Sequence, residues 1–87
     1  MAKMIDFAFE RENVIVCKIT GSRKEARKKG CELAKSFSAD ITLKEYNKRR
    51  HDWEFLATFH PDGTLHNYSG DLCRPSSDFN YTICINN

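Results

Sequence analysis

The sequence predicts an α+β fold in which one helix packs on a five- to six-stranded antiparallel sheet. Several short segments alternate apolar and polar residues, as strands do, whereas one segment carries the three-to-four-residue spacing of an amphipathic helix. The expected order is β-β-α-β-β-β, and the mostly short connections favour antiparallel pairing in a two-layer sandwich. At 87 residues the chain has room for one core, so we expect a single α+β domain over residues 1–87.

The N-terminal half is expected to form a hairpin followed by the helix. Residues 4–10 and 14–20 alternate apolar with polar side chains and are separated by a short polar turn. Ser22, with Glu25 three positions later, is typical of a capping box, in which each side chain accepts a hydrogen bond from the other residue's backbone. We therefore expect the helix to start after Ser22 and to run to about Phe37.

One face of this helix is apolar and contains a glycine. At 100° per residue the stripe consists of Ala26, Gly30, Leu33, Ala34 and Phe37. Glycine costs about 1 kcal/mol relative to alanine inside a helix. Gly30 therefore predicts a close approach of the helix to the sheet.

The C-terminal half is expected to supply the remaining strands, which start at Ile41 and then cover residues 53–60, 64–68 and 79–85. Trp53 continues the face of Phe55 and Phe59, which favours a position in the core. Between the middle strands, Pro61 presets φ and Gly63 accepts a positive φ, as a turn requires. Residues 69–77 are expected to be a loop.

Composition excludes several classes of protein. Apolar residues make up 40% and aromatic residues 11% of the chain, which is typical of a globular domain. No apolar run approaches the roughly 18 residues of a membrane helix, and the start MAKMIDFAFE lacks the layout of a signal peptide. We expect a cytoplasmic protein with no membrane partner.

The cysteines and histidines do not predict a catalytic or metal site. The four cysteines are separated by 14, 42 and 11 residues, whereas zinc sites use tightly spaced pairs. In a cytoplasmic chain we expect free thiols, and Cys17 shares the face of Ile15 and Ile19, which indicates the core. We expect no catalytic residues, no metal and no cofactor, although a small enzyme or metalloprotein stays an alternative.

Charge is distributed unevenly along the chain. The net charge is only +2, but residues 18–50 hold 11 basic and 4 acidic residues. On the helical wheel one flank gathers cations without an acid, and we take them as candidate partner-binding residues: Lys24, Arg27, Lys28 and Lys35. Arg23 and Lys24 stand in the first turn, where the helix dipole disfavours cations, so a negatively charged partner would compensate them. A solvated helix face is the alternative interpretation.

A second basic cluster follows between the third and fourth strands. Lys48, Arg49 and Arg50 are flanked by the aromatic residues Tyr46 and Trp53. Basic residues with aromatics suit nucleic-acid binding, and Arg, Tyr and Trp are also frequent in protein interfaces. We add Tyr46, Lys48, Arg49 and Arg50 to the candidate partner-binding residues.

The helical flank also predicts a reactive thiol. Cys31 lies among Lys24, Arg27, Lys28 and Lys35, and nearby positive charge favours a thiolate. We expect Cys31 to be the thiol that alkylates fastest in the native protein.

The stretch GSRKEARKKGCELAKSF, followed by DWEFLATFHPDGTLHNYSG, resembles in its layout small phage-encoded anti-CRISPR proteins with one helix on an antiparallel sheet. The resemblance implies a non-enzymatic inhibitor, encoded by a phage or mobile element, that docks on a host nucleic-acid-handling protein or ribonucleoprotein complex. The alternative is a protein that binds DNA or RNA directly. A structural role also stays open, since an edge such as residues 79–85 can pair with a second copy, giving a homodimer rather than a monomer.

Overall fold

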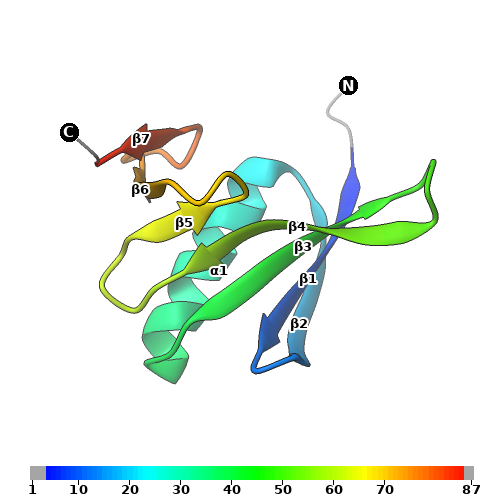
Figure 1. The fold of residues 1–87 in the computed structure, drawn as a ribbon, viewed down its shortest axis with the longest axis horizontal. Coiled ribbons are helices and arrows are strands. Elements are labelled where there is room, and N and C mark those ends of the chain that lie inside the picture. Colours follow the sequence, from blue (N-terminus) through cyan, green and yellow to red (C-terminus); the bar gives the residue numbers. More distant parts are fainter. Residues whose placement is uncertain (1–3, 86–87) are drawn as a thin grey trace.

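The computed structural model describes residues 4–85 and contains one helix and one antiparallel sheet. The helix lies against one face of the sheet, so the fold is α+β with two layers (Figure 1). Among the described residues, no helix has the length and apolar character needed to cross a membrane. The elements are β1 (Ile5–Arg11), β2 (Val14–Gly21), α1 (Arg23–Phe37), β3 (Ile41–Asn47), β4 (Asp52–Phe59), β5 (Leu65–Asn67), β6 (Leu72–Pro75) and β7 (Thr82–Cys84).

The connection from β2 to β3 explains why the helix covers one face. The strand order is β2-β1-β3-β4-β5-β6-β7, and both β2 and β3 pair antiparallel with β1. These two strands are therefore parallel to each other, and parallel strands require a crossover connection, commonly a helix. Helix α1 makes this crossover and packs over the central strands.

The expected boundaries of the helix are confirmed. Ser22 Oγ accepts a hydrogen bond from the Glu25 backbone N–H at 3.2 Å, and the Glu25 carboxylate accepts one from the Ser22 N–H at 3.2 Å. The helix ends at Phe37, and Ser38 adopts a left-handed conformation with φ 51°. The capping box thus satisfies backbone donors that a helix start leaves free.

The core lies between α1 and the sheet. Its largest fully buried side chains include Phe7 and Phe9 of β1, Ile41 of β3, Phe59 of β4 and Leu65 of β5. The helix contributes small residues to this core, namely Ala26, Gly30, Cys31 and Ala34. Small side chains on the helix and large ones on the sheet allow the two layers to approach closely.

The sheet has seven strands rather than the expected five or six. The segment 69–77, expected to be a loop, contains β6, and the terminal strand is confined to Thr82–Cys84. The Asn67 side chain folds the chain back after β5 by accepting hydrogen bonds at 3.0 Å from the backbones of Ser69 and Asp71. One short strand therefore fits where the polar composition had indicated a single long connection.

Two β-bulges overturn the expected orientation of several side chains. In β3–β4, Leu43 pairs with Ala57 but Lys44 pairs with Phe55, so one additional residue is inserted into β4. Directly opposed residues share a face of the sheet, so Phe55 and Trp53 lie on the face opposite the helix. The expectation that Trp53 belongs to the core beneath the helix was wrong.

The second bulge lies in the first hairpin. Phe9 pairs with Cys17 while Glu10 pairs with Ile15, so Ile15 and Cys17 face opposite sides of the sheet. Ile15 is consequently 49% exposed, and Cys17 is only partly buried against the core. Each bulge reverses the alternation of side chains for the part of the strand nearer the turn.

The contact of Gly30 with Phe59 generates the first prediction. A Cβ at Gly30 would lie 2.5 Å from two ring carbons of Phe59, which is only 1% exposed. We expect Gly30→Ala to lower the free energy of unfolding by about 2 kcal/mol, because overpacking outweighs the gain in helix propensity. Urea unfolding followed by circular dichroism measures this change.

Two further variants make the measurement specific to the contact. Ser36→Ala, at an exposed helical position, should change the stability by less than about 0.5 kcal/mol. Adding Phe59→Leu to Gly30→Ala should cost less than the sum of the single changes, because the two sites touch. A Gly30→Ala variant more stable than the wild type would contradict the close approach.

Candidate functional site

The strongest candidate site is the projecting end of the β3–β4 hairpin, called the hairpin arm here and comprising residues 46–53. In Figure 1 this end extends beyond the body of the sheet, away from β5, β6 and β7. It contains four of the candidate residues, Tyr46, Lys48, Arg49 and Arg50. These four residues, which are close together in the sequence, therefore lie on one projecting surface of the folded chain.

Asn47 organises the tip of the arm. Its side-chain oxygen accepts hydrogen bonds from the backbones of Arg49 at 2.9 Å and Arg50 at 3.3 Å, and its amide donates to Glu54 at 3.0 Å. An Asn side chain that bonds to the backbone two residues ahead stabilises a turn. Lys48, Arg49 and Arg50 are all exposed, so the turn carries three cationic side chains outward.

An aromatic pair supports the base of the arm. The rings of Tyr46 and Trp53 are direct partners across β3 and β4, with centroids 5.2 Å apart in an edge-to-face arrangement. The ammonium group of Lys18 lies 5.9 Å from the centroid of the Trp53 ring. Edge-to-face pairs and cation–π contacts each contribute roughly 0.5–1 kcal/mol. This cluster on the open face of the sheet connects the arm to β2.

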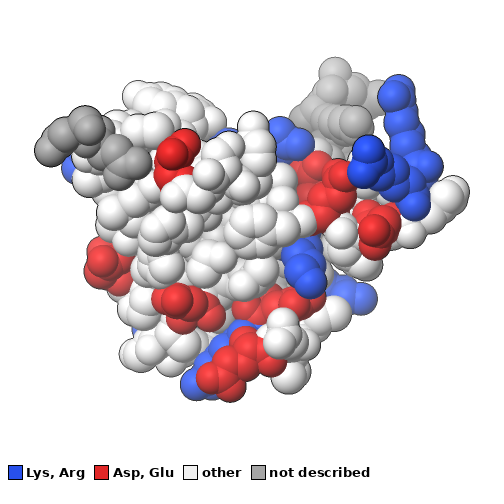
Figure 2. Space-filling model, in the orientation of Figure 1, with Lys and Arg blue, Asp and Glu red and all other residues white. Residues whose placement is uncertain are grey.

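The charge on this face is mixed, and among the described residues only the tip of the arm, residues 48–50, is uniformly basic. Figure 2 shows the largest group of basic side chains at the end of the β3–β4 hairpin, with acidic side chains next to it and scattered elsewhere. Arg50 approaches the carboxylate of Glu54 at 3.9 Å, and Lys44 pairs with Glu10 at 3.2 Å. The tip is therefore a small cationic surface bordered by acids.

The helical candidates lie in the other layer. Lys24, Lys28 and Lys35 are exposed on α1, which packs on the face of the sheet opposite Tyr46 and Trp53. With a rise of about 1.5 Å per residue, Lys35 lies about 18 Å along the helix from Arg23, whose side chain contacts the arm's strand β3. The structure thus separates the eight candidates into two groups.

Arg27 has a structural contact that the sequence did not indicate. Its Nη1 donates to the backbone oxygens of Phe79 at 2.9 Å and Asn80 at 3.1 Å, and the side chain is half-buried. Burial, followed by the charge of Arg23, lowers the pKa of the Arg27 guanidinium. Arg27 thus anchors the segment between β6 and β7, and a role for it in binding a partner stays a prediction.

Arg23 is also compensated within the chain. Its Nε and Nη2 donate to the two carboxylate oxygens of Glu45 at 2.9 and 3.1 Å. This bidentate hydrogen bonding raises the pKa of the Arg23 guanidinium. Arg23, in the first turn of α1, thus has an acidic partner within the chain. Its unfavourable position near the positive end of the helix dipole therefore does not indicate an external partner.

The expectation of a reactive thiolate at Cys31 was wrong. The side chain is 8% exposed and packs in the core, and this burial raises the pKa of the thiol. Lys35 acts in the opposite direction but is the smaller influence. In the structure the helix is rotated so that Cys31 faces the sheet. The helical wheel drawn from the sequence had instead placed Cys31 among the exposed lysines.

The structure also reveals a connected group of ionisable residues that spacing did not indicate. His60 Nδ1 lies 2.8 Å from an Asp40 carboxylate oxygen, and His60 Nε2 lies 2.6 Å from His66 Nδ1. Within residues 4–85 no serine, threonine or cysteine hydrogen-bonds to either ring, and no group of three potential ligands could hold a metal. The chain of hydrogen bonds links β4 and β5 to the start of β3.

No family model, curated protein or solved structure matches the chain. The resemblance to small anti-CRISPR proteins therefore stays a prediction from layout.

Thiol accessibility generates the second prediction. Cys84 is exposed, whereas Cys31 and Cys73 are buried and have raised pKa values. Because the thiolate is the reactive form, we expect iodoacetamide to label Cys84 first and Cys31 at least about tenfold more slowly. Raising the pH above the pKa of an ordinary thiol should accelerate the reaction at Cys31, because a larger share of its thiol then ionises.

Peptide mass spectrometry at successive times measures the order of labelling. The control is the protein unfolded in urea, in which all four thiols should react at similar rates. Labelling of Cys31 before Cys84 in the native protein would contradict the observed rotation of α1.

Proposed function

We propose that this chain is a small non-enzymatic binding protein whose hairpin arm docks on an acidic surface of a host nucleic-acid-handling complex and inhibits it. The observation that carries the proposal is the arm, with three exposed cations above the Tyr46–Trp53 pair. Arginine, tyrosine and tryptophan are the residues that most often dominate binding energy in protein interfaces. The class of partner is what the layout resemblance implies, and the cytoplasm stays the expected site of action.

The surroundings of the arm favour a protein over a nucleic acid. The ring of Trp53 is approached by both Lys18 and Tyr46, which leaves less of it for a base to stack on. An acidic protein surface needs only the local cations of the tip, whereas a nucleic acid usually requires a more extended basic surface.

Direct binding of DNA or RNA is the second candidate function. It is favoured by one observation, the uninterrupted run Lys48-Arg49-Arg50 at an exposed turn. Each neutralised phosphate on duplex DNA contributes about −0.9 to the log–log slope of affinity against salt. Three arm cations would therefore give a slope of about −2.7 with an oligonucleotide.

The third prediction concerns the charge of the arm. We expect the triple change Lys48→Glu, Arg49→Glu, Arg50→Glu to weaken capture of the partner from host lysate by about 100-fold, because it removes attraction and adds repulsion. Affinity purification of tagged protein, with and without nuclease, followed by quantitative mass spectrometry, measures the capture. Circular dichroism checks that the variant is folded.

A matched variant changes the same number of charges on the helix. Lys24→Glu, Lys28→Glu, Lys35→Glu should reduce capture less than about threefold if the arm is the contact surface. Equal losses for both variants would show only general charge attraction and would refute docking by the arm. A partner that nuclease releases, together with the salt slope given above, would favour direct nucleic-acid binding.

A further inference from the structure

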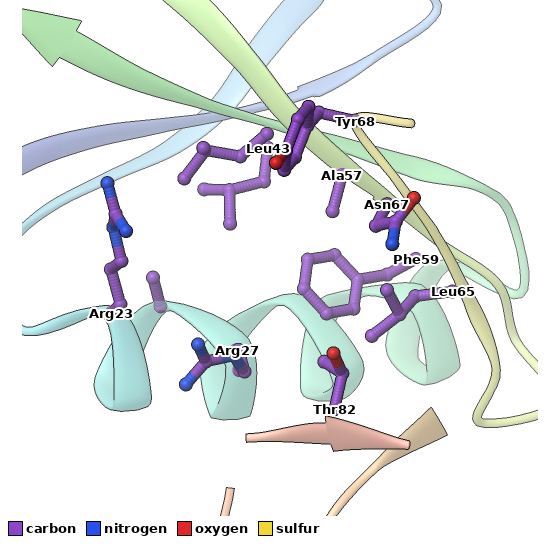
Figure 3. A pocket seen from close by; sticks show the side chains of 11 residues that line it. Arg23, Arg27, Leu43, Ala57, Phe59, Leu65, Asn67, Tyr68 and Thr82 are labelled. Atoms are coloured by element: carbon purple, nitrogen blue, oxygen red, sulfur yellow. The ribbon is translucent and has the colours of Figure 1, made fainter. Parts of the chain in front are cut away.

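A pocket of about 180 Å³ lies between α1 and the β4–β5 end of the sheet (Figure 3). Its floor consists of Leu43, Ala57, Phe59 and Leu65, none more than 7% exposed. Protein interiors contain few voids larger than a water molecule, and an apolar cavity of roughly 150 Å³ is enough to bind benzene. The pocket, which opens to solvent on one side, therefore has the volume and the apolar floor to hold a single ring.

Two guanidinium groups line the mouth of the pocket, and one of them, that of Arg23, is paired with Glu45. Arg23 and Arg27, one helical turn apart, both line the pocket, and no Asp or Glu is among its lining residues within the described part of the chain. Arg23 contacts Glu45 through Nε and Nη2, and Arg27 contacts backbone oxygens through Nη1. Some guanidinium nitrogens make no hydrogen bond within residues 4–85, namely Nη1 of Arg23 and the Nε and Nη2 atoms of Arg27. These nitrogens can donate to an anion.

The rim offers aromatic and polar groups as well. The rings of Phe59 and Tyr68 border the space from the sheet side, and Thr82 borders it from β7 (Figure 3). Two aromatic side chains favour a flat, unsaturated occupant, which they can contact by face or edge. The lowered pKa of Arg27 reflects burial beside a second cation, which a bound anion would offset.

We propose that this pocket binds a small monocyclic aromatic carboxylate. The ring packs on Ala57, Phe59 and Leu65, and the carboxylate accepts hydrogen bonds from Arg23 and Arg27 at the mouth. Ligand pockets commonly combine such an apolar body with a few placed polar groups. This site does not depend on the proposed function, because none of the three cations at the tip of the arm lines the pocket.

The test compares phenylacetate with benzyl alcohol, which keeps the ring and lacks the charge. Calorimetric titration of the full chain should give an affinity at least about tenfold higher for phenylacetate. Arg27→Met should remove that difference by weakening phenylacetate about tenfold while leaving benzyl alcohol unchanged. Arg74→Met, which removes an exposed cation outside the pocket, is the matched control and should change neither affinity.

A second variant keeps the test decisive if Arg27→Met does not fold. Ala57→Leu fills the floor of the pocket and should abolish the binding of both probes, while amide NMR shifts show that the fold is retained. Equal affinities for the acid and the alcohol, or no binding of phenylacetate at millimolar concentration, would overturn the proposal. So would unchanged binding to Ala57→Leu.

A second feature is independent of the pocket. Cys73 and Cys84 are direct partners across β6 and β7, and their Sγ atoms are 3.8 Å apart. The backbone N–H of Ile85 donates to Leu72 O, and the backbone N–H of Ser76 donates to Tyr81 O. Cys73 and Cys84, which lie between these two bonds, are therefore opposed at a non-hydrogen-bonded position. Side chains approach most closely at such positions, at a spacing that suits a disulfide.

We infer that Cys73 and Cys84 form a reversible disulfide when the protein meets hydrogen peroxide. The Cys84 thiolate attacks peroxide, whose O–O bond breaks, giving a sulfenic acid and hydroxide. The Cys73 sulfur then attacks the Cys84 sulfur, and the hydroxyl group leaves as water with the thiol proton. Two thiols are thus oxidised by two electrons, one peroxide is reduced to two waters, and a thiol reductant restores the pair.

Mass spectrometry under non-reducing conditions tests this pairing. One equivalent of peroxide should lower the mass of the wild type by that of two hydrogen atoms and link the peptides that contain Cys73 and Cys84. Cys84→Ser should abolish this loss, whereas Cys17→Ser, at a thiol outside the pair, should retain it. Linkage of any other pair, or oxidation of Cys84 to a sulfinic acid without linkage, would overturn the inference.

Discussion

The close contact between Gly30 of α1 and the ring of Phe59 in β4 determines how the rest of the structure is arranged. The helix must cross from β2 to β3, and the absence of a side chain at position 30 lets its axis lie near the sheet. From that position Arg23 reaches Glu45, and Arg27, one helical turn later, reaches the segment before β7. The open face of the sheet is left to the arm and its aromatic pair.

The parts of the fold that could be predicted are those encoded within a few residues. Ser22 and Glu25 define the helix start by their spacing, and the 60–63 turn is defined by its own residues. A β-bulge has no comparable local signal, because it depends on which residues of two strands pair. The bulges therefore reversed the expected faces of Ile15 and Trp53, although the strands themselves were predicted.

The candidate site was predictable to the same extent. Residues of the arm are contiguous and end up on one projecting surface, so the sequence cluster was enough to find it. The internal partners of the helical arginines are distant, with Glu45 lying 22 residues from Arg23 and Phe79 lying 52 residues from Arg27. Counting charges along the chain treats such cations as free, because only the folded chain brings the acceptors near.

These internal contacts also bear on how the arm would bind. On the face toward the helix, the Arg23–Glu45 pair holds β3 just before the arm begins. On the opposite face, Lys18 and Trp53 tie the start of β4 to β2. A projecting hairpin held on both faces has less conformational freedom to lose on association, and preorganisation of this kind strengthens binding without new contacts. Arg23, whose charge the sequence had suggested an external partner would compensate, thus contributes by fixing the direction of the arm.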